Sequence, residues 1–166
     1  KSGSDRPAEE IARRKDRQGN GELRIRDAYI LDADGHKAAS AVTGKDISIA
    51  IEYACKPGAE LKGIVIGLGV TSSRGEGVFL CHTEMTKADF GVVSGTGIFE
   101  CSIPELPLTP GIYSVSARII NNGAEVLDYM QNIFSFEVLD GDFFGTGSTI
   151  KHSLVYVHHS WKKTSL

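Results

Sequence analysis

From residue 22 onward, short runs of alternating apolar and polar residues dominate the sequence, and this pattern constrains the fold more than any other feature. Alternation with a period of two places apolar side chains on one face of a strand and polar side chains on the other. Glycine-rich turn signals separate the runs, for example Asp34-Gly35, Arg74-Gly75 and Asp140-Gly141. We predict strands at residues 23–31, 46–54, 63–71, 77–82, 97–103, 111–119, 124–129, 133–139 and 153–159.

Eight or nine short strands without a convincing helix after residue 21 are typical of an all-β sandwich or barrel. The strongest local signal is Asn122-Gly123, which separates two alternating runs. Both residues accept the positive φ angles of a type I′ turn, so the sequence predicts a tight hairpin at this point.

The strand before this hairpin has two distinct faces. Tyr113 and the apolar residues in phase with it, Val115, Ala117 and Ile119, predict a core face, and Ser114, Ser116 and Arg118 predict an outer face. A proline-rich segment, residues 104–110, precedes the strand, and we expect its prolines to hold a crossover between sheets in extended form. We also expect the Tyr113 ring to pack inward while its hydroxyl reaches the backbone, as in the tyrosine corner of immunoglobulin-like sandwiches.

Size and charge exclude several classes of protein. The 166 residues suit one soluble domain, and no apolar run approaches the roughly 18 residues of a membrane span. A net charge of −3 argues against nucleic-acid binding, which usually needs a clustered basic face. The three cysteines, Cys55, Cys81 and Cys101, form no CxxC pair, so we predict buried free thiols in a reducing compartment and no structural zinc site.

Residues 1–21 differ from the rest because they are charged and nearly without large apolar side chains. We predict a polar linker with a short solvated helix from residue 8 to about residue 17, because its single isoleucine is too little to anchor it to a core. The first ten residues lack the apolar region of a secretory signal. The predicted domain boundaries are therefore a linker at 1–21, a sandwich at 22–161 and a tail at 162–166.

No sequence motif for catalysis is present. The chain has no phosphate-binding loop, no HExxH motif and no GxSxG nucleophile elbow, so we predict no catalytic residues and no cofactor. His158 and His159 are neighbours on a predicted strand, where they point to opposite faces, and Cys81 and His82 diverge in the same way. We therefore predict neither a metal site nor a catalytic thiol.

Several motifs, taken in order, resemble a known family. They are "VTGKDISIAIEY" (42–53), "LKGIVIGLGVTSSRG" (61–75), "GTGIFECSIPELPLTPGIYSVSARI" (95–119), "LDY" (127–129), "FSFEV" (134–138) and "VHHSW" (157–161). This order is similar to that of the C-terminal domain of Wzt, the nucleotide-binding subunit of the ABC transporters that export O-antigen polysaccharide. The most specific part is "IPELPLTPGIY", residues 103–113, followed by the hairpin.

The resemblance implies an antiparallel β-sandwich of immunoglobulin-like or jelly-roll topology that has no catalytic activity. Its implied ligand is the non-reducing terminus of a completed, capped O-polysaccharide. The implied partners are an upstream ATPase domain joined through residues 1–21, a membrane permease and a second copy of the chain. Because the predicted strand at 153–159 follows a glycine-rich segment, we expect the two copies to exchange this strand. The implied location is the cytoplasmic face of the inner membrane of a Gram-negative bacterium.

We predict that the sugar site lies on the polar face of the strand at 111–119. Short polar groups, a cation and room above the sheet are what a shallow sugar site needs. Arg118 is the first candidate, because a guanidinium suits a terminal acidic group or phosphate. The other candidates are Ser114, Ser116, Ser48, Glu52, Arg74, His82 and the aromatic Tyr156, with Gly63, Gly67 and Gly69 leaving room above the sheet.

Two other interpretations remain open at this point. An immunoglobulin-like protein-interaction domain without glycan binding would expose an apolar patch of several hundred Å². A hydrolase on a jelly-roll scaffold would place two carboxylates face to face across a cleft.

Overall fold

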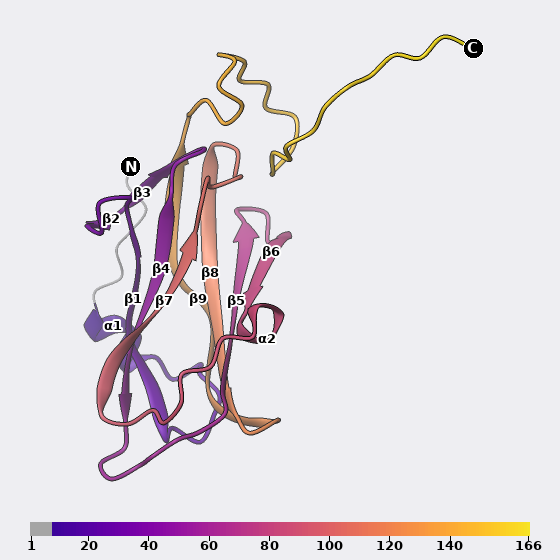
Figure 1. The fold of residues 1–166 in the computed structure, drawn as a ribbon. Coiled ribbons are helices and arrows are strands. Elements are labelled where there is room, and N and C mark those ends of the chain that lie inside the picture. Colours follow the sequence, from indigo (N-terminus) through magenta and orange to yellow (C-terminus); the bar gives the residue numbers. More distant parts are fainter. Residues whose placement is uncertain (1–7) are drawn as a thin grey trace.

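The computed structural model describes residues 8–166 and folds them into two sheets packed face to face (Figure 1). One sheet has four strands in the order β2-β1-β4-β7, and the other has five in the order β3-β9-β8-β5-β6. The elements are α1 (Ala8–Arg13), β1 (Leu23–Leu31), β2 (Lys37–Ala38), β3 (Ser40–Val42), β4 (Ile47–Cys55), β5 (Ile64–Ser72), β6 (Gly77–His82), α2 (Thr83–Thr86), β7 (Thr96–Ile103), β8 (Gly111–Asn121) and β9 (Glu125–Leu139). Neither helix among these described residues is long and apolar enough to cross a membrane.

The predicted all-β sandwich is confirmed, and most strand positions follow the alternating runs. Six runs became β1, β4, β5, β6, β7 and β8, and the runs at 124–129 and 133–139 joined into the single strand β9. All pairings are antiparallel except that of β3 with β9, which is parallel. β2, β3 and α2 were not predicted, since elements of two to four residues carry no measurable periodicity.

The core lies between the sheets and consists of the apolar residues that point inward from each strand. Ile49 of β4, Val115 of β8 and Phe136 of β9 are almost completely buried, at 0%, 0% and 1% exposed. Residues 104–110 cross from β7 in one sheet to β8 in the other, as the prolines predicted. The Tyr113 hydroxyl donates a hydrogen bond of 2.7 Å to the backbone carbonyl oxygen of Thr109, which confirms the predicted corner.

The hairpin between β8 and β9 forms at the predicted position. Asn122 and Gly123 have φ angles of 37° and 87°, and the strands resume pairing at Asn121 and Glu125. A register shift follows between Ile119 and Ile120. This shift opposes Arg118 to Tyr129 and turns both Leu127 and Asp128 inward, each 0% exposed. The shift therefore breaks the simple alternation on β9 and brings an aromatic residue beside Arg118.

The segment before β1 is tied to the sandwich, so the prediction that one isoleucine is too little to anchor it is wrong. Ile11 of α1 is 0% exposed and belongs to the core. The predicted helix is present but ends at Arg13. Gln18 exchanges two backbone hydrogen bonds with Tyr129, of 3.0 and 2.8 Å, and the Arg17 guanidinium bonds to the buried Asp128 carboxylate. The segment that composition predicted to be a linker is therefore held against the sandwich by a buried ion pair and a short strand-like pairing.

The predicted last strand, residues 153–159, does not form. A single bridge joins Val155 to Leu108, with backbone hydrogen bonds from Thr109 to Leu154 and from Tyr156 to Pro107. The preceding segment packs through aromatic rings, with Phe143 against Tyr156 and His158. The chain then runs away from the sandwich to its end (Figure 1). Trp161 is 91% exposed.

Candidate functional site

A hollow lies on the outer face of the five-stranded sheet, across β6, β5, β8 and β9. Its volume is about 370 Å³. We call it the outer hollow, and its lining residues are Val65, Gly67, Gly69, Leu80, His82, Ser116, Ala117, Arg118, Ile120 and Tyr129. No carboxylate is among them.

The register of the strands explains why the sheet is hollowed here. One row across the sheet reads His82, Gly67, Arg118 and Tyr129, and the neighbouring row reads Leu80, Gly69 and Ser116. In both rows the residue on β5 is a glycine, whereas the residues on the neighbouring strands have side chains. A Cβ atom added at Gly69 would meet nothing within 4 Å, and one at Gly67 would lie 3.1 Å from Cδ2 of His82. The two glycines therefore form an open floor with side chains on both sides.

Arg118 and Tyr129 form the wall on the β8 and β9 side. Arg118 is exposed, and within residues 8–166 its guanidinium has no hydrogen-bond or ion-pair partner. The Tyr129 ring is half-buried beside it, and its hydroxyl accepts a hydrogen bond of 2.9 Å from Nε2 of Gln131. The Ser116 hydroxyl oxygen accepts a hydrogen bond of 2.9 Å from the backbone N–H of Asn132. This wall therefore offers five guanidinium donors next to a fixed aromatic ring.

His82 closes the opposite side of the outer hollow. It is the last residue of β6 and the N-cap of α2, where its Nδ1 accepts a hydrogen bond of 3.3 Å from the backbone N–H of Glu84. In the neutral imidazole this leaves the proton on Nε2, which is then a donor above Gly67. The cap thus fixes both the position of the ring and the nitrogen that can bind a ligand.

This combination of groups suits a polyhydroxylated ligand. Arg118 and His82 supply donors for hydroxyl or acidic oxygens, while Tyr129 and Leu80 supply apolar surface for C–H groups. Two facing carboxylates, which a glycoside hydrolase needs, are not among the residues that line the hollow.

Three of the eight predicted site residues come together in the outer hollow, namely Arg118, Ser116 and His82. Gly67 and Gly69 lie beneath them, as the sequence suggested. Ser114 shares their face of β8, but it lies outside the hollow, and its hydroxyl is 2.9 Å from that of Ser135. Gly63 lines a different depression beside α2.

Glu52 and Ser48 lie elsewhere, and the expectation that their strand neighbours the Arg118 strand is wrong. Both are on β4, which belongs to the other sheet, because alternation gives the faces of a strand but not the sheet it joins. Glu52 accepts a hydrogen bond of 2.9 Å from the Tyr29 hydroxyl. Burial and this bond together raise the pKa of Tyr29 to about 12. Ser48 faces Ser102 on β7, with 3.3 Å between their hydroxyl oxygens.

Arg74 and Tyr156 are also outside the outer hollow. Arg74 is in the turn between β5 and β6, where it lines a separate depression with residues of the C-terminal segment. The Tyr156 ring stacks on Phe143, and its hydroxyl donates a hydrogen bond of 2.8 Å to the carbonyl oxygen of Ile150. Its aromatic surface is therefore used in packing the C-terminal segment.

Tyr129 was not predicted as a site residue. A two-residue hairpin at Asn122-Gly123 would have placed Leu127 opposite Arg118. The longer turn and the register shift place Tyr129 there instead. A useful signal was the adjacent apolar pair Val126-Leu127, which breaks the alternation where the register shifts.

One group of side chains has the composition of a cation site. Asp32, Asp34 and His36 lie in the turn between β1 and β2, with ligand atoms within 4.8 Å of one another. Asp32 already accepts hydrogen bonds of 2.9 Å from the backbone N–H groups of His36 and Asp34, and these bonds hold its pKa below the usual value. The carboxylate thus has a structural role in the turn.

Comparison with known proteins identifies the architecture. A family model described as the Wzt C-terminal domain matches residues 14–156. The crystal structure of the C-terminal domain of Wzt superposes with a TM-score of 0.72 at 17% identity, covering 91% of this chain and 90% of that one. An alkylpurine DNA glycosylase, AlkC of Pseudomonas fluorescens bound to DNA, is similar over 71% of this chain and 30% of its own, with a TM-score of 0.43 and 16% identity. No curated protein sequence matches the chain.

Proposed function

The chain belongs to the Wzt C-terminal domain family, and from this membership we propose that it is a non-catalytic carbohydrate-binding module of an O-antigen transporter. We place the glycan in the outer hollow. The observation that carries this assignment is the pair of glycine-centred rows, which set an unpaired arginine and a tyrosine opposite a histidine across an open floor. Such sites bind sugars through oriented donors and an aromatic or apolar surface.

The ligand that we propose is the non-reducing end of a finished O-polysaccharide. A volume of about 370 Å³ is at the small end of ligand pockets and suits a terminal residue better than a length of chain. Arg118 suits a terminating group that is acidic, such as a phosphate or a uronic acid, because its planar guanidinium pairs with two oxygens at once. With a neutral terminus it donates to hydroxyls. Recognition of a cap would admit only completed chains to export.

The family also implies an arrangement of partners. In this proposal residues 1–21 lead from an ATPase domain and, from Ile11 onward, also pack against the recognition module, which residues 22–161 form, while 162–166 are a tail. The ATPase would associate with a membrane permease, which places the module at the cytoplasmic face of the inner membrane of a Gram-negative bacterium.

We also propose that the chain acts as a homodimer that exchanges its C-terminal segment. Within the described chain the expected last strand pairs only around Val155, where Leu154 and Tyr156 bond to the backbone of Thr109 and Pro107, and Val157 and Trp161 beyond it are 67% and 91% exposed. A strand left without a partner is a ready template for another chain. Light scattering should give the mass of a dimer, and removal of residues 157–166 should give a monomer. A dimer that survives this deletion would contradict the exchange.

Replacement of Arg118 tests the proposed site. We expect Arg118→Ala to weaken binding of the native O-polysaccharide by about tenfold or more, since a hydrogen bond to a charged group contributes about 1.5–3 kcal/mol. Arg118→Lys should recover part of the lost affinity if binding depends on the positive charge. It should recover little if binding depends on the bidentate geometry of the guanidinium. The measurement is calorimetric titration. Arg26→Ala, an exposed arginine on β1 in the other sheet, is the control. Equal affinities of Arg118→Ala and Arg26→Ala for the O-polysaccharide would show that Arg118 does not contribute to the site.

A protein-interaction domain remains the second candidate. Leu80, Met85 and Phe90 around α2 are 50%, 68% and 38% exposed, which gives one side of the sandwich an apolar character. Absence of glycan binding in the same titration would favour this alternative.

A further inference from the structure

The sandwich is open along one side, between the free edges of its two sheets. β6 ends the five-stranded sheet and β7 ends the four-stranded sheet. A cleft of about 410 Å³ lies between them, which we call the edge cleft. Its lining includes Leu68, Cys81, Phe90, Phe99 and Cys101.

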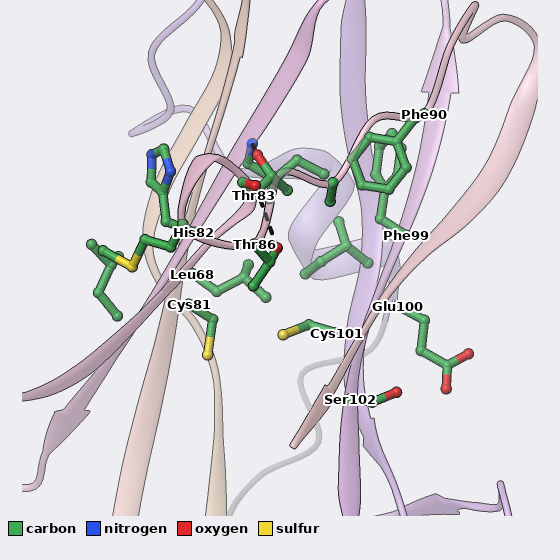
Figure 2. Close-up of a pocket in the computed structure, with 15 residues that line it drawn as sticks. Leu68, Cys81, His82, Thr83, Thr86, Phe90, Phe99, Glu100, Cys101 and Ser102 are labelled. Atoms are coloured by element: carbon green, nitrogen blue, oxygen red, sulfur yellow. Dashed lines mark hydrogen bonds between the residues drawn. The ribbon is translucent and has the colours of Figure 1, made fainter. Parts of the chain in front are cut away.

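Cys81 and Cys101 face each other across the edge cleft. Cys81 pairs with Leu68 on the neighbouring strand, and Cys101 pairs with Ile49. Both of these partners are buried between the sheets, at 3% and 0% exposed, so the two thiols also point inward. Figure 2 shows both sulfur atoms in the space between the two strands, with that of Cys101 pointing toward Cys81, while the His82 ring points away from them.

The two thiols interact, and the interaction makes them chemically different. The nearness of the two thiols lowers the pKa of Cys101 and raises the pKa of Cys81. Burial raises the pKa of the third thiol, Cys55. Since the thiolate is the nucleophile, the direction of these pKa shifts favours Cys101 as the attacking cysteine of the three.

We propose that Cys81 and Cys101 form a redox-active pair that a peroxide converts into a disulfide joining β6 to β7. The Cys101 thiolate attacks the peroxide, so that an S–O bond forms, the O–O bond breaks and hydroxide leaves. The Cys81 sulfur then attacks the sulfenic sulfur, so that the S–S bond forms and the S–O bond breaks. Two thiols and one hydrogen peroxide give one disulfide and two waters, and the two electrons pass from sulfur to peroxide.

The disulfide would change the outer hollow, a consequence that rests on the proposed function. A disulfide bridges only Cα atoms about 4.4–6.8 Å apart, so its formation fixes the spacing of the two free edges at this point. On β6, Leu80 and His82 flank Cys81 and point to the outer hollow. Oxidation on the inner side of β6 therefore fixes the wall of the glycan site on its outer side.

Peptide mass spectrometry tests the pair directly. The reduced chain is treated with hydrogen peroxide at neutral pH, free thiols are alkylated, and the peptides are identified. We expect a Cys81–Cys101 intramolecular disulfide, lighter by two hydrogens, with Cys55 alkylated. In Cys81→Ser, Cys101 should accumulate as a sulfenic acid that dimedone traps. In Cys101→Ser, Cys81 should stay reduced, and Cys55→Ser should behave as the unmodified chain does. Equal oxidation of all three thiols, or disulfides only between chains, would overturn the proposal.

The effect on the outer hollow is measured separately by titrating the reduced and oxidised chains with the native O-polysaccharide. We expect a several-fold change in affinity that dithiothreitol reverses and that Cys81→Ser abolishes. An unchanged affinity would overturn the link between the pair and the site. If the reduced chain binds no glycan, the proposed function fails. The mass spectrometry still tests whether Cys81 and Cys101 form a disulfide, because it does not depend on glycan binding.

Discussion

Asp128→Ala should lower the free energy of unfolding by about 3–5 kcal/mol, because it leaves a buried arginine without its counterion. Asp128 is 0% exposed, and its carboxylate accepts hydrogen bonds from Arg17 and, at 2.8 Å, from the backbone N–H of Ile25. The Arg17 guanidinium also donates to the carbonyl oxygens of Ile11 and Ile25. The change therefore affects α1, β1 and β9 together.

Chemical denaturation of the unmodified chain and of Asp128→Ala measures this difference in the free energy of unfolding. Asp140→Ala is the matched control, since Asp140 pairs with Lys151 in an exposed ion pair of 3.0 Å, and such pairs contribute about 0–1 kcal/mol. Asp128→Asn should cost less than the alanine variant, because the amide keeps an acceptor for Ile25. A loss below about 1 kcal/mol for Asp128→Ala would show that the segment before β1 contributes little to the folded state.

Gly69→Leu should abolish most glycan binding while leaving the fold intact. A side chain at this position enters the middle of the row formed by Leu80, Gly69 and Ser116. An unrelieved clash costs about 1–3 kcal/mol, and the upper end corresponds to about a hundredfold loss of affinity. The Cβ itself meets nothing within 4 Å. Loss of a strand glycine should even stabilise the chain by about 0.5–1 kcal/mol.

Titration and thermal unfolding of the same sample separate these two effects. Gly77→Leu is the control, since its added Cβ also meets nothing within 4 Å and it lies on β6 outside the outer hollow. We expect normal binding for Gly77→Leu and strongly reduced binding for Gly69→Leu. Retained binding in Gly69→Leu would move the glycan site away from the outer hollow.

Alternation was enough to predict the strands that carry the site. The phase of Ser114, Ser116 and Arg118 identified an outer face, and Asn122-Gly123 located the hairpin beside it. Gly67 and Gly69 in the same pattern predicted the open floor of the outer hollow. These features are local, so each can be predicted from a few consecutive residues.

The rest of the site depends on contacts between distant segments. Glu52 was misplaced because periodicity does not tell which sheet a strand joins. Tyr129 was missed because a register shift on β9 decides which residue lies opposite Arg118. The anchoring of the first segment depends on Arg17 meeting Asp128, 111 residues away. Interactions of this kind arise only after the sheets have assembled.

Calorimetric titration with the native O-polysaccharide tests the central claim most directly, when intact chains are compared with chains that lack the terminal non-reducing residue. Our account predicts saturable binding of the intact glycan, clearly weaker binding of the trimmed glycan, and loss of this difference in Gly69→Leu. Equal binding of both glycans would contradict terminus recognition, and absence of binding to either would contradict a carbohydrate-binding function.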